Sequence, residues 1–184
     1  MAIDKIQSES INLADNFAFT GTVSGAGGVN TPAFFSSVSA DQTVSDNTVT
    51  KVQCDTEHFD TNSAYDNSTN YRFTVPSGQA GKYHVYASLQ TRSVANTEQY
   101  NTVAFIYKNG SNFLANEINP YDNPISVLNT KLSAVIDLSV GDYLEFYGRS
   151  DTVSGTVYFR HDSAAHTDNP TIGTTHWGAY KIIT

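Results

Sequence analysis

Alternating apolar and polar positions run along most of the chain and predict strands rather than helices. The clearest case is segment 82–89, where Tyr83, Val85, Ala87 and Leu89 alternate with Lys82, His84, Tyr86 and Ser88. Successive side chains of a strand point to opposite faces, so we predict a half-buried strand of an antiparallel sheet here.

Nine further segments with strand-like sequence, separated by turn residues, are predicted strands: 33–40, 48–54, 70–74, 102–108, 113–115, 131–138, 143–147, 156–160 and 177–183. The predicted inward-facing residues include Leu132, Ala134, Ile136, Leu138, Leu144 and Phe146. Lys108-Asn109-Gly110 predicts a hairpin turn with positive backbone φ angles. No long segment has apolar residues at helical spacing. We therefore predict an all-β fold of ten strands in a two-sheet sandwich or jelly roll.

The composition agrees with strands and limits the partners. The 11 Tyr and 10 Phe residues fit a pleated surface. The net charge of −8 argues against nucleic acid and against an anionic membrane surface. No apolar run approaches the ~20 residues that a spanning helix needs, so we expect no membrane insertion. The single cysteine, Cys54, excludes an internal disulfide and fits a small semi-buried strand residue better than a reactive thiol.

Residues 1–30 differ from the rest of the chain. Their scattered apolar positions are Ile3, Ile6, Ile11, Leu13, Phe17 and Phe19, and segment 21–28 is a glycine-rich connector. The segment is either a disordered tail or an anchor that is ordered against a partner. Six large apolar residues favour the anchor, because a solvated tail usually carries fewer. We therefore divide the chain into an extended N-terminal anchoring arm, 1–30, and a jelly-roll domain, 31–184.

Segment 59–89 carries a family resemblance. It contains FD at 59–60, YD at 65–66, a polar turn, FTVP at 73–76 and GKYHV at 81–85. This order resembles the signature of the complement component 1q globular head. The likeness extends to LSVGD at 138–142 and to WGAY at 177–180. The resemblance implies the ten-strand jelly roll that this family shares with tumour necrosis factor, and a compact homotrimer.

Five tyrosines are our candidates for the trimer interface, because they fall on strand faces opposite the predicted core residues: Tyr86, Tyr143, Tyr147, Tyr158 and Tyr180. The family resemblance also permits calcium, which family members bind with Asp and backbone oxygens. The acidic turns of this chain point to no particular set of ligands. We therefore assign no cofactor.

Catalytic motifs are absent from the sequence. It has no Gly-x-Ser-x-Gly elbow and no phosphate loop, and its carboxylates are spread through turns. We expect no enzymatic activity. One cluster, His161, Asp162, His166, Asp168 and His176, has the donor types of a transition-metal site. Its spacing matches no specific zinc pattern, so we favour a surface loop with incidental histidines and assign no metal.

Two classes of function fit the sequence. The opening segment 1–23 resembles N-terminal segments of tailed-phage virion proteins and lacks the apolar region of a secretory signal. The first class is therefore a virion structural protein made in the host cytoplasm, whose arm binds other virion proteins and whose trimeric head projects as a fibre, knob or capsid decoration. A surface rich in Ser, Thr, Asn and Tyr suits contact with a host glycan or protein. The alternative is a free, lectin-like binding module of the same fold.

Overall fold

The computed structural model describes residues 30–93, 99–120, 122–153, 156–161 and 173–182. These residues form thirteen strands and no helix. The strands are β1 (Ala33–Ser37), β2 (Gln42–Ser45), β3 (Thr50–Lys51), β4 (Thr56–Asp60), β5 (Tyr65–Asp66), β6 (Arg72–Thr74), β7 (Gly81–Ser93), β8 (Gln99–Lys108), β9 (Ser111–Ile118), β10 (Val127–Leu138), β11 (Tyr143–Thr152), β12 (Thr156–Phe159) and β13 (His176–Lys181). The predicted all-β class is confirmed.

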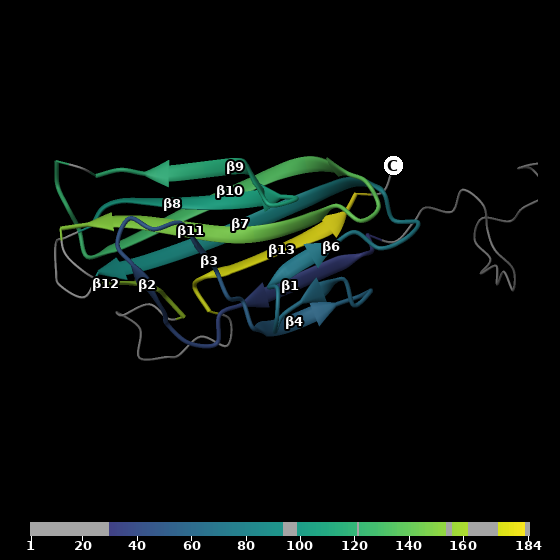
Figure 1. The fold of residues 1–184 in the computed structure, drawn as a ribbon, viewed down its shortest axis with the longest axis horizontal. Coiled ribbons are helices and arrows are strands. Elements are labelled where there is room, and N and C mark those ends of the chain that lie inside the picture. Colours follow the sequence, from purple (N-terminus) through teal and green to yellow (C-terminus); the bar gives the residue numbers. More distant parts are fainter. Residues whose placement is uncertain (1–29, 94–98, 121, 154–155, 162–172, 183–184) are drawn as a thin grey trace, which may run out of the picture.

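The strands form two antiparallel sheets. The larger one, here called the β7 sheet, has the order β2-β12-β7-β13-β1-β4. Strands β12 and β13 pair with different parts of the same side of β7, and β10 pairs with its other side from Gly81 to Arg92. The smaller one, the β11 sheet, has the order β5-β6-β11-β8-β9, and β3 also pairs with β11. Figure 1 shows the long strands β7, β8, β10 and β11 running together, with β1, β4 and β13 grouped at one side. This arrangement is a jelly roll.

The core lies between the two sheets and is built by the alternation that the sequence shows. On β7, Tyr83, Val85, Ala87 and Leu89 are all buried, as predicted. On β11, Leu144 and Phe146 are fully buried, and Leu132, Ile136 and Leu138 of β10 are buried on the side facing them. Burying a side chain of this size stabilises the fold by ~1.5–3 kcal/mol each. The predicted strand faces are therefore correct.

Aromatic side chains fill one part of this core. Phe34 stacks on Tyr65 with ring centroids 4.6 Å apart and meets Trp177 edge to face at 4.9 Å. The Tyr65 hydroxyl donates to the backbone oxygen of Cys54 at 2.8 Å and accepts from Trp177 Nε1 at 3.3 Å. Burial raises the pKa of Tyr65 and of the Cys54 thiol. Cys54 is fully buried, and it lies after the end of β3 rather than in a strand as predicted.

A hydrogen-bonded polar cluster occupies another part of the space between the sheets. Gln99 Oε1 accepts from Thr91 Oγ1 at 2.6 Å and from Ser150 Oγ at 2.8 Å. Thr102 Oγ1 lies 2.6 Å from Thr91 Oγ1. All four residues are buried, and hydrogen bonding offsets the cost of removing their polar groups from water.

The strand boundaries differ from the sequence predictions in two ways. First, β2, β4 and β5 were not predicted, because they are short and their residues lack a clean apolar alternation. Second, predicted strand 48–54 contracts to β3, whereas β7, β8, β9, β10 and β11 extend beyond their predicted ends. The added residues at these strand ends are mostly polar, and they continue the strands because the long neighbouring strands supply backbone hydrogen-bond partners. The predicted hairpin turn is confirmed, since Asn109 and Gly110 have φ angles of 52° and 77°.

Candidate functional site

The outer surface of the β7 sheet, here called the β7 face, carries a group of aromatic and histidine rings. Phe35 of β1 is at its centre. The Phe35 ring stacks on His58 at 5.0 Å, lies 6.1 Å from Tyr86 and meets His176 edge to face at 5.4 Å. His84 continues the group, with its ring 5.9 Å from Tyr86 and 5.2 Å from Tyr180.

A β-bulge places His58 in this group. The pairing of β1 with β4 shifts register after Phe35, which pairs with Phe59, while the next residue, Ser36, pairs with Glu57. His58 is the extra residue of the bulged strand. Consequently both His58 and Phe59 reach the Phe35 ring, at 5.0 and 6.2 Å. His58 Nε2 is also 2.9 Å from Ser37 Oγ.

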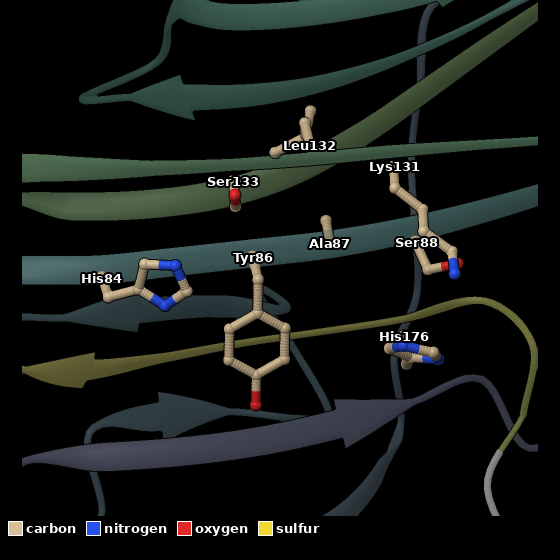
Figure 2. Close-up of a pocket in the computed structure, with 8 residues that line it drawn as sticks. All are labelled: His84, Tyr86, Ala87, Ser88, Lys131, Leu132, Ser133 and His176. Atoms are coloured by element: carbon tan, nitrogen blue, oxygen red, sulfur yellow. The ribbon is translucent and has the colours of Figure 1, made fainter.

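Gly178 lets Tyr86 lie flat on the sheet. A Cβ atom at position 178 would be 2.5 Å from Tyr86 Oη and 2.6 Å from the backbone oxygen of Phe34. Tyr86 starts on β7, so its ring crosses β13 at the position where β13 has no side chain. Figure 2 shows this ring between His84 and His176, reaching from β7 across β13 towards β1. Burial, followed by the nearby Tyr180, raises the pKa of Tyr86.

A shallow pocket of about 380 Å³ opens beside this ring. Its lining residues include His84, Tyr86, Ser88 and His176, with Lys131 and Leu132 from β10 (Figure 2). His84 Nδ1 is buried and has no hydrogen-bond partner among the described residues. His176 Nδ1, in contrast, lies 2.9 Å from the Gly173 backbone oxygen. The pocket is therefore a mixed aromatic and polar surface depression.

The β7 face also exposes apolar groups. Val135 of β10 is 57% exposed, Phe59 48% and Tyr180 37%.

At the far edge of the other sheet, β9 is exposed along nearly its whole length, and its Phe113 is 54% exposed. An open edge strand presents unpaired backbone groups that another chain can pair with. The described part of the molecule thus has an open aromatic face and an open edge.

The outer surface of the β11 sheet, here called the β11 face, is different in character. The ring centres of Tyr147 and Tyr107 are 4.2 Å apart, and the Lys51 ammonium lies 5.6 Å from the Tyr147 ring centre. Lys51 Nζ is also 2.6 Å from Glu145 Oε1. The rings of this face stack on one another and on cations.

The structure divides the five predicted interface tyrosines between these faces. Tyr86 and Tyr180 lie on the β7 face, and Tyr158 of β12 lies on the same side of that sheet, opposite the buried Val157 and Phe159. Tyr143 and Tyr147 lie on the β11 face, on the other side of the core. Sequence reasoning identified tyrosines away from the core but could not tell which sheet each strand joins. Alternation in 33–40 could also have placed Phe35 outside the core. Extending the alternation of 177–183 back by one residue could have placed His176 there too.

Other predicted site residues are only partly described. The anchor residues Ile3, Ile6, Ile11, Leu13, Phe17 and Phe19 lie outside the described residues, and so do Asp162, His166 and Asp168. His161 follows β12 and His176 begins β13, and both lie next to Gly173: a Cβ at Gly173 would be 3.2 Å from His161 Cδ2, and His176 Nδ1 is 2.9 Å from the Gly173 backbone oxygen. Asp41 Oδ1 accepts from the His161 backbone N–H at 2.8 Å. Within the described ranges no three His, Cys, Asp or Glu side chains gather in a metal-binding arrangement. Those ranges also contain no helix long and apolar enough to cross a membrane.

Comparison with known proteins supports the fold. No protein-family model matches the chain, and no curated protein is similar enough in sequence to match. Solved structures do match. Murine APRIL at pH 5.0 superposes with a TM-score of 0.53 at 12% identity, over 82% of this chain and 98% of that chain. Eiger TNF from S. frugiperda gives 0.55 at 14% identity, over 82% of this chain and 91% of that chain. The chain therefore has a jelly roll of the tumour necrosis factor type.

Proposed function

We propose that this chain is a non-enzymatic virion structural protein of a tailed bacteriophage. In this proposal the jelly roll assembles as a homotrimer that projects from the particle as a fibre, knob or capsid decoration, and residues 1–30 attach it to other virion proteins. The host surface is the outward partner. The single structural observation that carries the trimer is the aromatic and histidine group on the β7 face, which a single chain leaves only partly covered.

The β7 face and the β9 edge make complementary contact surfaces. A ring of three copies needs two different surfaces on each copy, because each one contacts both neighbours. The β7 face offers the exposed Phe59 and Tyr180 beside the half-buried Phe35, and the edge strand β9 offers the exposed Phe113. Aromatic residues are enriched at such interfaces. We therefore assign the β7 face of one copy to the β9 edge of the next.

Two features support this assembly. The fold is of the tumour necrosis factor type, and the complement 1q resemblance of segment 59–89 implies a compact trimer. On this assignment Tyr86, Tyr158 and Tyr180 contribute to the interface. The predicted interface role of Tyr143 and Tyr147 is not part of this assignment, because both lie on the β11 face. The alternative function, a free lectin-like module, uses the same fold but needs no arm.

Sedimentation of paired variants tests the trimer. Tyr180→Glu places a charge on the β7 face, and Tyr147→Glu places the same charge on the β11 face as a matched control. We expect wild type and Tyr147→Glu to sediment as trimers and Tyr180→Glu as a monomer of about the 20.0 kDa chain mass. A monomeric wild-type protein at micromolar concentration contradicts the assembly.

Particle incorporation tests the arm. Trimerisation links three arms and raises the effective concentration of each at its binding site. We expect Phe17→Asp combined with Phe19→Asp to leave the head folded and trimeric and to abolish incorporation into particles. Wild-type copy numbers of this variant in purified virions would show that the arm plays no part in attachment.

A further inference from the structure

Two histidines flank the aromatic centre of the β7 face. The rings of His58 and His176 contact the Phe35 ring at 5.0 and 5.4 Å. A third histidine, His84, lies 5.9 Å from the Tyr86 ring, on the opposite side of that ring from His176 (Figure 2). All three histidines are half-buried in a single chain, so water still reaches them before assembly.

Hydrogen bonds determine which of these rings accepts a second proton most readily. His176 Nδ1 is 2.9 Å from the Gly173 backbone oxygen, which only accepts, so Nδ1 carries the proton of the neutral ring and Nε2 takes the second. His58 Nε2 is 2.9 Å from Ser37 Oγ, a hydroxyl that can accept from the charged ring. His84 Nδ1 is buried without a hydrogen-bond partner among the described residues, which makes a charged ring costly there. His58 and His176 are therefore the two groups that charge first.

Neighbouring charges do not offset a positive charge on either ring. Apart from tyrosines and histidines, the ionisable residues of β4, β7, β10 and β13 are Glu57, Asp60, Lys82, Arg92, Lys131, Asp137 and Lys181. Asp60 accepts from the backbone N–H groups of Asn62 and Tyr65. Within the described ranges no carboxylate forms an ion pair with His58 or His176. Lys131 lines the same pocket as His176 and adds positive charge there.

Assembly would change the surroundings of both rings. The proposed function places the β9 edge of the next copy on this face, and that edge exposes Phe113 and Ile118. Strand β9 has a single carboxylate, Glu117. Apolar contact removes water from the rings, and burial disfavours the charged form of histidine. A second proton therefore binds the separated chain more tightly than it binds the trimer.

We propose that protonation of His58 and His176 in mildly acidic solution separates the trimer into folded single chains. The inference rests on the proposed function, because it takes the β7 face as the interface, and it adds a means of regulation to that face. Histidine is the side chain that ordinarily changes its charge between about pH 5 and pH 8, so the trimer should be stable above this window and lost as pH falls through it.

Proton linkage gives the size of the effect. If each copy takes up one proton on separation, a trimer takes up three. The association constant then falls about 1,000-fold for each pH unit within the titration window, because each proton contributes a factor of about ten. At a fixed protein concentration the change from trimer to single chains should therefore be complete within about one to two pH units.

Sedimentation velocity of the full chain at micromolar concentration, in steps from about pH 8 to about pH 5, tests the inference. We expect a trimer at the upper end and chains of about 20.0 kDa at the lower end, with an unchanged circular dichroism spectrum. His58→Gln combined with His176→Gln keeps polar side chains that cannot be charged, so this variant should remain trimeric throughout. His161→Gln, which removes a histidine that does not contact Phe35, is the matched control and should dissociate as wild type.

The possible outcomes separate this inference from the proposed trimer. A wild-type trimer that persists or tightens at the acidic end overturns the inference and leaves the trimer standing. Loss of the trimer through unfolding overturns it too, as does a double variant that is trimeric at neutral pH and dissociates at the same pH as wild type. If the double variant does not assemble, His58→Gln and His176→Gln are measured singly, and each should lower the midpoint pH. A wild type that is a single chain at every pH contradicts the proposed trimer, and the inference with it.

Discussion

Gly178→Ala is the substitution whose consequence the structure specifies most closely. The added methyl carbon would lie 2.5 Å from Tyr86 Oη, 2.7 Å from Tyr86 Cζ and 2.6 Å from the Phe34 backbone oxygen. Optimal carbon contacts are ~3.5–4 Å, so each of these is too close by about 1 Å. Tyr86 can rotate away from the sheet. The Phe34 oxygen cannot move without separating β1 from β13, where Phe35 pairs with Gly178.

The expected cost follows from these contacts. Inserting a methyl group into a packed site typically costs ~1–3 kcal/mol. Replacing glycine with alanine recovers ~0.4–1 kcal/mol by restricting the unfolded chain. Because one short contact is to backbone, we expect the upper part of the cost range, ~2–3 kcal/mol, and a net loss of ~1–2.6 kcal/mol. At ~2–4 °C per kcal/mol for a domain of this size, the melting temperature should fall by about 2–10 °C. The variant should also weaken the proposed trimer, because Tyr86 leaves its position on the β7 face.

Thermal unfolding followed by circular dichroism, at matched protein concentrations, measures the effect. Ser133→Ala, at an exposed position of β10, is the control and should melt within about 1 °C of wild type, as surface substitutions usually do. In a double-mutant cycle, Tyr86→Ala should recover part of the Gly178→Ala loss, because two of the three short contacts are to Tyr86. A Gly178→Ala protein that melts with wild type, or the absence of coupling to Tyr86, would refute the packing described for this face.

Two further predictions concern the core and the turn at Asp142. Phe146→Ala should lower stability by ~3–5 kcal/mol, because the ring is fully buried, whereas Phe113→Ala, 54% exposed, should cost far less; equal melting temperatures would contradict the strand faces. Hydrogen bonds from Asn109 and Lys108 lower the pKa of Asp142 from its usual value of 3.8 to about 2. A lowered carboxyl pKa stabilises the fold above the unfolded value and loses that contribution as pH falls, so wild-type stability should drop more steeply than that of Asp142→Asn between about pH 4 and pH 2. Urea unfolding at stepped pH measures it, and parallel curves would contradict the prediction.

Strand identity and strand faces were readable from the sequence because they depend on local alternation. In 82–89 and 131–138 every second side chain is apolar, and a one-residue shift would expose the whole set, so the inward face is determined before any partner is known. The Asn109-Gly110 turn was readable for the same local reason, since its residues tolerate positive φ. Short β2, β4 and β5 were missed because their positions depend on neighbouring strands more than on their own side chains.

Only the tertiary structure decided which outward residues meet. Tyr86 and Tyr143 look alike in sequence, but β7 and β11 belong to opposite sheets, so the two tyrosines lie on opposite sides of the core. The group around Phe35 draws on four strands that are distant in sequence, and His58 joins it through a bulge that no local pattern indicates. Side-chain alternation is local, so the sequence alone determines it. The neighbours of an outward side chain depend on strand order, which is set by pairing between segments distant in sequence.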